Sequence, residues 1–250
     1  AHRLPADAVM VVCPSDPHSG KAAAFVLAAQ AAAALALEGW LVSLGIAATT
    51  PETGFGYLER GEAIGKLGFR TAQFVEKPDA ERARAFVADG GYAWNGGIFG
   101  FVGGDFFDEL RHHRPAMAEA VRNAVDTGCE DGARFYPGAA PFAAIDGESV
   151  DYAVMENTQR AAMVPADMDW SDIGNWQALH AARGGDGAGN SVAGDAELVD
   201  CRNVLVDTDG PKVSVIGLEN VIVVIDGDDV LITSADGAQK VGKLSGAANQ

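Results

Sequence analysis

Ala8-Val-Met-Val-Val-Cys13 and Trp40-Leu-Val-Ser-Leu-Gly-Ile46 are two continuous apolar runs that flank the alanine-rich residues 21–38. Runs of this length without polar alternation are typical of strands covered on both faces of a parallel sheet. Residues 21–38 contain no Gly or Pro and are followed by Gly39, which predicts a helix with a glycine cap. Strand, helix and strand in this order form a right-handed βαβ unit, so the sequence predicts an α/β fold.

The character of the chain changes after the Gly-rich residues 183–189. Short β-branched runs follow at near-regular spacing, and Asp, Gly and Asn separate them. This pattern indicates a small β-solenoid that needs the main domain as its cap. We therefore expect an α/β domain over residues 1–183 and a β-coil domain over residues 190–250.

The composition limits the classes of function. The 250 residues include 35 acidic and 18 basic side chains, a net charge of −17, and are 48% apolar. The apolar content is enough for a folded core. The acidic excess argues against a nucleic-acid partner, which needs clustered Lys and Arg. A phosphorylated substrate would require local cations or a metal ion to overcome the overall field.

The cysteines and the N-terminal residues favour a reduced, cytoplasmic protein without a membrane partner. Cys13, Cys129 and Cys201 are odd in number and far apart, so a disulfide framework and a zinc site are both disfavoured. Cys13 lies in an apolar run and is predicted to be a core residue. Residues 1–5 show no signal-peptide pattern, and residues 22–37 are too short for a membrane span.

One candidate site segment is Phe74-Val-Glu-Lys-Pro78. A predicted strand over residues 69–75 delivers an acid and a base directly before Pro78, which cannot continue a central strand. The loop at residues 49–57 contains two glycines that would let a ligand approach the backbone closely. Trp94 and Asn95 are predicted to form a turn before a strand at residues 98–102.

A second candidate segment is Asp167-Met-Asp-Trp-Ser-Asp172, with three acids in six residues. Asp172 precedes a predicted helix at residues 175–182, so it either caps that helix or holds a hard cation. Asp16 follows the first predicted strand, where open α/β sheets place ligands, although a turn or cap role is the simpler interpretation. The two segments together predict the two ends of one site for an anionic ligand.

Five motifs and the closing segment resemble the mannose-1-phosphate guanylyltransferase family, and the resemblance covers essentially the whole chain. The closing residues 216–232 look like its short C-terminal left-handed β-helix. The motifs occur in the family's order: Pro51-Glu-Thr-Gly-Phe-Gly-Tyr57, Phe74-Val-Glu-Lys-Pro-Asp79, Trp94-Asn-Gly-Gly-Ile-Phe99, Val150-Asp-Tyr-Ala-Val-Met-Glu156 and Trp170-Ser-Asp-Ile-Gly-Asn-Trp176.

The resemblance implies a Rossmann-like, mostly parallel sheet and a nucleotidyltransferase activity. GTP and mannose 1-phosphate would give GDP-mannose and pyrophosphate, by in-line attack of the sugar phosphate oxygen on the α-phosphorus. The enzyme would mainly position the reactants and neutralise charge. Asp16 and Asp172 match the family's two magnesium-binding acids, which makes Mg²⁺ the expected cofactor.

The resemblance also assigns the sugar phosphate site. Lys77 would contact the phosphate as a point charge, and Glu76 would bind sugar hydroxyls. Asn95 and the backbone N–H near Gly56 would complete the pocket. Lys77 and Asp172 are the expected catalytic residues.

Three departures from the family pattern shape the remaining expectations. The family's glycine-rich phosphate loop and a following Pro-Lys-Gln segment are not found in the 250 residues, so we expect an N-terminally truncated, inactive fragment of the enzyme. Pro17 stands where the family has His after the metal-binding acid, and Gly96 replaces the usual Ser after Asn95.

Two alternatives stay open. One is another sugar-1-phosphate nucleotidyltransferase, and the other is a non-catalytic sugar-nucleotide-binding regulatory subunit. A homodimer is a further expectation, because an exposed β-coil edge commonly needs a partner or cover.

Overall fold

The computed structural model describes residues 5–15 and 18–244. The chain divides into two compact units, one formed by Ala1–Ser15 with Lys21–Trp170 and the other by Asp16–Gly20 with Ser171–Gln250. Helix α6 (Trp176–Arg183) therefore belongs to the second unit, before the boundary expected at residues 183–189. The physical reason is that Trp176 packs against the buried cluster of Leu205, Ile222 and Val224 in that unit.

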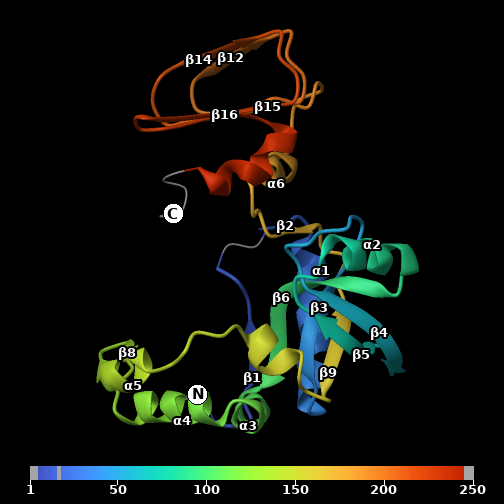
Figure 1. The fold of residues 1–250 in the computed structure, drawn as a ribbon, viewed down its shortest axis with the longest axis vertical. Coiled ribbons are helices and arrows are strands. Elements are labelled where there is room, and N and C mark those ends of the chain that lie inside the picture. Colours follow the sequence, from blue (N-terminus) through green and yellow to red (C-terminus); the bar gives the residue numbers. More distant parts are fainter. Residues whose placement is uncertain (1–4, 16–17, 245–250) are drawn as a thin grey trace. The chain divides into compact units, whose positions relative to one another are not determined.

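The first unit is an α/β domain built on a six-stranded sheet (Figure 1). The strand order is β1-β6-β3-β9-β5-β4, and β4 also pairs with the start of β6. The elements of this unit are β1 (Val9–Val12), α1 (Ala22–Leu37), β3 (Leu41–Ala47), β4 (Tyr57–Ile64), β5 (Gly68–Val75), α2 (Ala80–Asp89), β6 (Tyr92–Val102), α3 (Gly103–His113), α4 (Pro115–Asp126), β7 (Cys129–Asp131), β8 (Arg134–Tyr136), α5 (Ala139–Ala143), the one-turn π-helix η1 (Asp151–Met155) and β9 (Ala161–Pro165).

The pairing within this sheet differs from the mostly parallel sheet expected. Among the described strands of the six-stranded sheet, β3 and β9 pair in parallel, and the other pairings are antiparallel. Strands β4 and β5 form a hairpin through a turn at Gly65, whose φ is +56°. A tight turn can only join antiparallel strands, which explains the pairing of β4 with β5. The domain is therefore an α/β domain with a mixed sheet.

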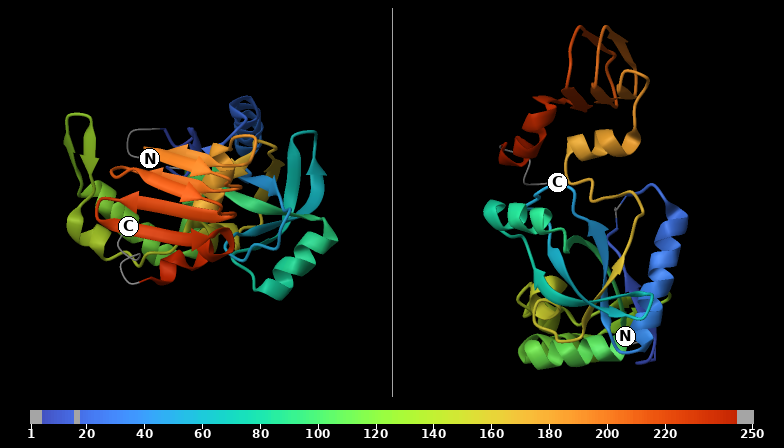
Figure 2. Two further views of the ribbon diagram at one scale, coloured as in Figure 1. Left: turned by 90° about the horizontal axis from the view of Figure 1, so that it is seen from above. Right: turned by 90° about the vertical axis from the view of Figure 1, so that its right-hand side faces the viewer.

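Strand β3 is buried on both faces, as its apolar run predicts. Val42 and Leu44 pack with Leu35 of α1, and Leu41 packs in a second cluster with Leu110 of α3. The right-hand view of Figure 2 shows α1, in blue, running along one side of the sheet. Helices thus cover both faces of the central strand, which is the three-layer arrangement of an α/β domain.

Strand β1 does not match its predicted environment. It pairs with β6 alone among the described strands and lies at the end of the strand order. Val11 and Val12 are 42% and 39% exposed, and Cys13 is exposed rather than in the core. An apolar run indicates a strand, but it does not reveal whether a neighbouring strand or helix covers it.

The second unit is the expected β-coil. Strands β11 (Ser191–Ala193), β13 (Leu205–Thr208) and β15 (Val221–Asp226) pair in parallel, and so do β12 (Ala196–Val199) and β14 (Val213–Ile216). Strand β16 (Asp229–Ser234) closes the coil antiparallel to β15, as Figure 1 shows. The left-handed sense of the coil stays a prediction.

Two helices of the second unit pack against its coil, and the expectation that the main domain caps the coil stays a prediction. Within the second unit, α6 contributes Trp176 and the 3₁₀-helix η2 (Ala235–Lys243) contributes Ala238 to the cluster around Leu205. The unit also contains β2 (His18–Ser19), and β10 (Trp170–Ser171) spans the division between the units. None of the helices in the described part of the chain has the length and apolarity needed to cross a bilayer.

Candidate active site

The acid and base of the Phe74–Pro78 segment lie at the end of β5, as predicted. Lys77 has a φ of +46°, a left-handed conformation that is costly for a residue with a side chain and that clusters at functional sites. The bend directs the two side chains differently: the Glu76 side chain is 9% exposed and the Lys77 side chain 58% exposed. Lys77 Nζ lies 3.6 Å from Glu76 Oε1.

Gly56 and Asn95 lie directly against this acid. The Asn95 N–H donates to the Gly56 carbonyl oxygen over 2.8 Å. A Cβ atom on Gly56 would collide with Glu76 Oε2 and would lie 3.2 Å from Asn95 Cβ. The structure therefore brings together Gly56, Glu76, Lys77 and Asn95, the four residues assigned to the sugar phosphate site.

The loop before β4 is held in place by aromatic and hydrogen-bonding contacts. The Tyr57 hydroxyl donates to the Glu52 carbonyl oxygen over 2.9 Å. The Phe55 ring meets the rings of Trp94 and Trp170 edge to face, with centroids 5.3 and 5.4 Å apart, a favourable arrangement of aromatic pairs. These contacts fix the backbone on both sides of Gly56.

Trp94 and Asn95 do not form the predicted turn, because both lie within the continuous strand β6. The strand instead contains a bulge: from the Ser43–Phe99 pair to the Gly45–Asn95 pair, β3 advances two residues and β6 four. Gly97 takes a φ of +66°, and its N–H donates to Asn95 Oδ1 over 3.2 Å. The Asn-Gly-Gly composition that predicts a turn produces a bulge here, because flanking β3 and β4 keep the strand extended.

Two acids that sequence reasoning missed contact Asn95 and Glu76. Asn95 Nδ2 donates to Asp151 Oδ1 over 2.9 Å, and the Glu76 N–H donates to Glu156 Oε1 over 2.8 Å. Asp151 is the first residue of the π turn η1, and Glu156 directly follows the turn. Their presence in the Val150–Glu156 motif was the available signal, but the sequence did not indicate a π turn.

The Glu76 carboxyl group is in an unusual electrostatic position. Burial raises the pKa of Glu76 above its ordinary value, the Asp151 carboxylate raises it further, and Lys77 opposes the shift. Glu76 Oε2 is buried and has no hydrogen-bond partner among the described residues. A buried oxygen without a partner is costly, so a ligand hydroxyl that donates to it gains the full hydrogen bond.

Of the two predicted metal-binding acids, the structure describes one. Asp16 lies outside the described residues. Asp172 belongs to the second unit, is exposed, and makes no hydrogen bond or ion pair with the residues that the structure describes. The predicted alternative that Asp172 caps the following helix is wrong, because Asn175 Oδ1 accepts the Ala178 N–H over 2.9 Å.

The other two acids of the Asp167–Asp172 segment form ion pairs with Lys21. Lys21 Nζ lies 3.0 Å from both Asp167 Oδ1 and Asp169 Oδ1. No group of three or more His, Cys, Asp or Glu residues suited to a metal ion occurs within residues 5–15 and 18–244. Asp172 is thus the acid of this segment that is left open for a ligand.

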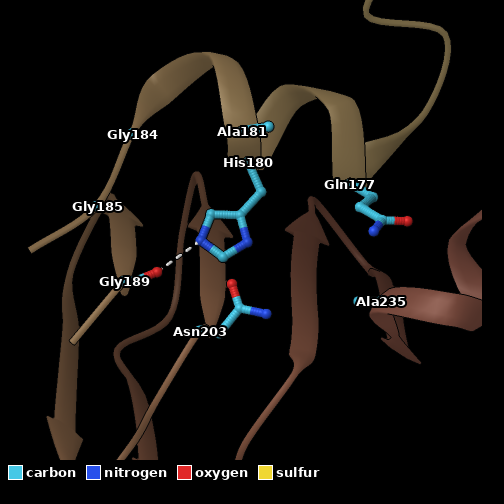
Figure 3. Close-up of a pocket in the computed structure, with 8 residues that line it drawn as sticks. All are labelled: Gln177, His180, Ala181, Gly184, Gly185, Gly189, Asn203 and Ala235. Atoms are coloured by element: carbon cyan, nitrogen blue, oxygen red, sulfur yellow. Dashed lines mark hydrogen bonds between the residues drawn. The ribbon is translucent and has the colours of Figure 1, made fainter. Parts of the chain in front are cut away.

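A separate cavity of about 270 Å³ lies in the second unit (Figure 3). His180 Nε2 lies 2.9 Å from the Gly189 carbonyl oxygen at its wall, and Asn203 lies opposite. It contains none of the residues that the sequence assigns to the site.

A profile of the family described as "Nucleotidyl transferase" matches residues 2–187. The chain belongs to the nucleotidyl transferase family. A second profile, described as "MannoseP isomerase/GMP-like beta-helix domain", matches residues 194–245, which agrees with the parallel coil.

Curated relatives match along nearly the whole chain. A mannose-1-phosphate guanylyltransferase of Escherichia coli is 40% identical over 243 residues, covering 95% of this chain and 51% of the relative. The alginate biosynthesis protein AlgA of Pseudomonas syringae pv. tomato is 38% identical over 246 residues, covering 98% of this chain and 51% of the relative. The chain spans about half the length of these curated relatives.

Solved structures are also similar. The crystal structure of a protein named mannose-1-phosphate geranyltransferase from Thermus thermophilus has a TM-score of 0.83 and 32% identity, covering 94% of this chain and 68% of that one. A Helicobacter pylori protein named mannose-6-phosphate isomerase has a TM-score of 0.61 and 28% identity, covering 68% of this chain and 66% of that one.

Proposed function

We propose that this chain provides the sugar-phosphate site of a mannose-1-phosphate guanylyltransferase, which converts GTP and mannose 1-phosphate into GDP-mannose and pyrophosphate. One observation carries the proposal. A buried Glu76 oxygen without a partner in the described part of the chain lies against Gly56 and Asn95, with the Lys77 ammonium group beside the same carboxyl group. The Escherichia coli relative, 40% identical, carries the name of this activity.

The pocket is suited to a sugar. The Glu76 carboxyl group can accept hydrogen bonds from sugar hydroxyls, and the lack of a side chain on Gly56 leaves the space that Glu76 Oε2 occupies. The Asn95 amide adds a donor at a fixed position, because it is held by Asp151 and Gly97. These groups orient the sugar ring by its hydroxyls.

Lys77 is suited to the phosphate. Its ammonium group is largely exposed at the end of β5, so it can reach a phosphate on a sugar held by Glu76. A local positive charge is needed because the chain as a whole carries a net charge of −17. Held in this way, the sugar phosphate oxygen can be aimed in line at the α-phosphorus of GTP.

The cofactor, location and assembly are further parts of the proposal. We propose Asp16 and Asp172 as the residues that would hold Mg²⁺, which when bound supplies charge neutralisation at the phosphates. Asp172 fits this role because it is an exposed carboxylate without a partner in the described part of the chain. A cytoplasmic homodimer remains part of the proposal.

The sugar site can be tested with two matched glycine substitutions. Gly56→Ala places a methyl group against Glu76 Oε2, whereas a Cβ on the exposed Gly147 meets nothing within 4 Å. We expect Gly56→Ala to weaken binding of mannose 1-phosphate by on the order of tenfold or more, because it displaces the carboxylate, and Gly147→Ala to bind as the wild type does. Isothermal titration calorimetry measures both, and equal affinities of the two variants would count against this site.

Turnover decides between the proposed activity and its alternatives. The product of the complete gene is incubated with GTP, Mg²⁺ and a panel of hexose 1-phosphates, and sugar nucleotide is quantified. Mannose 1-phosphate is the expected substrate, and Asp172→Asn is expected to abolish its conversion. Preference for another hexose 1-phosphate would indicate a different nucleotidyltransferase, and binding without turnover would indicate a regulatory subunit.

A further inference from the structure

A single π-helical turn behind the sugar pocket carries two carboxylates without a role in the proposed chemistry. The turn η1 is closed by a hydrogen bond from the Glu156 N–H to the Asp151 carbonyl oxygen, 2.9 Å long. In an α-helix, residues five apart point about 140° away from each other. A turn closed from residue i to i+5 instead brings them onto one side, so Asp151 and Glu156 can reach the same pocket.

Asp151 controls the orientation of the Asn95 amide. Asn95 Nδ2 donates to Asp151 Oδ1 over 2.9 Å, while Asn95 Oδ1 accepts the Gly97 N–H over 3.2 Å. A carboxylate can only accept hydrogen bonds, so this partner requires the NH₂ group on its side. The amide therefore has one allowed orientation, with its second N–H hydrogen left for another acceptor.

Glu156 controls the backbone under the pocket acid Glu76. Its Oε1 accepts the Glu76 N–H over 2.8 Å. This is a hydrogen bond to a charged acceptor, which is about twice as strong as one between neutral groups. It fixes the chain at the residue before Lys77, where φ becomes positive.

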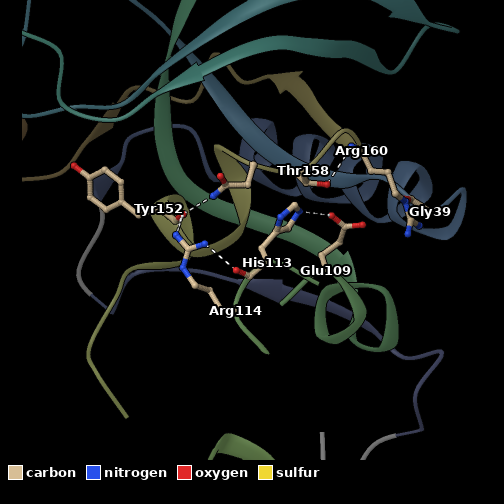
Figure 4. Close-up of polar contacts among 8 residues, drawn as sticks. Gly39, Glu109, His113, Arg114, Tyr152, Thr158 and Arg160 are labelled. Carbon is tan, nitrogen blue, oxygen red and sulfur yellow. Dashed lines mark hydrogen bonds and ion pairs between the residues drawn. The ribbon is translucent and has the colours of Figure 1, made fainter. Parts of the chain in front are cut away.

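The turn itself is held from its other side. The Tyr152 carbonyl oxygen accepts a hydrogen bond from Arg114 Nη2 over 3.1 Å, as Figure 4 shows. It also accepts one from Asn157 Nδ2 over 2.7 Å. The side chains of Ala153, Val154 and Met155 are buried in the core. A turn anchored in both directions can serve as a rigid support for the groups it contacts.

We propose that Asp151 and Glu156 are positioning residues of the sugar pocket: Asp151 orients the Asn95 amide, and Glu156 fixes the backbone that carries Glu76 and Lys77, before the sugar phosphate binds. The proposal rests on the proposed function, because it concerns the same pocket. It adds two residues that act through others and do not touch the substrate.

Paired substitutions at Asp151 separate this role from a general effect on folding. Asp151→Asn keeps an oxygen that accepts the Asn95 N–H, whereas Asp151→Leu removes it and leaves a buried donor unpaired. We expect affinity for mannose 1-phosphate to fall by on the order of tenfold in the Leu variant and by about threefold at most in the Asn variant. Glu119→Gln, an exposed charge removal on α4, serves as the control and is expected to bind as the wild type does.

A double-mutant cycle tests whether Asp151 acts through Asn95. In an Asn95→Ala background, Asp151→Leu is expected to change the affinity by less than about twofold, because the group it positions is gone. Melting temperatures show that each variant is folded. An undiminished effect in that background would overturn the positioning role of Asp151.

Glu156 is tested by the amide proton of Glu76 in ¹H–¹⁵N spectra. Glu156→Ala is expected to shift that resonance upfield and to weaken mannose 1-phosphate binding, while Glu156→Gln keeps an acceptor and preserves most of both. An unchanged Glu76 resonance in the Ala variant would overturn the role of Glu156. If the wild type binds no hexose 1-phosphate, the proposed function fails; if it binds and the variants match it, only this inference fails.

Discussion

Glu76 combines two properties at the scale of a single residue. Its side chain is 9% exposed, and its Oε2 has no partner among the described residues, so the folded chain carries a cost there. A site that binds a ligand through such a group gives up stability in the free state. The same carboxyl group therefore links the stability of the free protein to its affinity for a sugar.

This link predicts a pH-dependent effect of Glu76→Gln. Burial and Asp151 raise the pKa of Glu76, so its contribution to stability is present below the ordinary carboxyl pKa of 4.5 and is lost as pH rises through the raised value. The neutral Gln keeps that contribution at every pH. We expect Glu76→Gln to melt at a higher temperature than the wild type at pH 7 and to lose this advantage at about pH 4.

Differential scanning fluorimetry across this pH range measures the effect. The control is Glu119→Gln, which removes an exposed carboxylate and should leave the difference near zero at both pH values. A lower melting temperature for Glu76→Gln at pH 7 would show that Lys77 outweighs burial at this site.

The sequence predicted that Gly56, Glu76, Lys77 and Asn95 lie together, but it did not predict which residues hold them in place. Glu76 and Lys77 could be found because Pro78 must end β5, and Gly56 because a two-glycine loop precedes β4. The hydrogen bond between Asn95 and Asp151 joins residues 56 positions apart, and no local pattern reports such a contact.

At the scale of secondary structure, the sequence predicted an element correctly where the residues of that element determine its structure. The helix predicted over residues 21–38 is α1 (Ala22–Leu37), and Gly39 follows its end with a φ of +90°. The errors arose where neighbours decide the outcome. The bulge in β6 depends on pairing with β3 and β4, and the exposure of β1 depends on what lies beside it.

The N-terminus of α6 provides a test at this scale. Asn175 caps the helix, whereas the nearby Asp172 does not contribute to the cap. We expect Asn175→Ala to destabilise α6 by about 1 kcal/mol and Asp172→Asn to leave it unchanged. Hydrogen exchange of the α6 amides, followed by mass spectrometry, measures both.

The comparison also bears on the metal proposal. If Asp172→Asn leaves exchange in α6 unchanged, a loss of turnover in that variant cannot be assigned to helix unfolding. Faster exchange in Asp172→Asn than in Asn175→Ala would mean that the capping assignment is wrong.

At the scale of the whole molecule, the second unit has two apolar clusters of its own. Val204, Val206 and Val223, with their neighbours, fill the coil interior. Trp176 of α6 and Leu205 belong to the other cluster, on the opposite face of β13, because successive side chains of a strand point to opposite faces. A unit with its own core meets a requirement for folding alone.

We therefore expect residues 171–250 to fold when produced as a separate fragment. Trp176 is the only tryptophan in this segment, so its fluorescence reports directly on the packing of α6 against the coil. The native fragment should show blue-shifted emission and a cooperative urea transition.

Leu205→Ala, which removes a fully buried contact of Trp176, should lower the unfolding free energy by about 2–5 kcal/mol, and Ile216→Ala, at a side chain 69% exposed, should change it little. Emission that matches the urea-denatured fragment would show that the coil depends on the first unit after all.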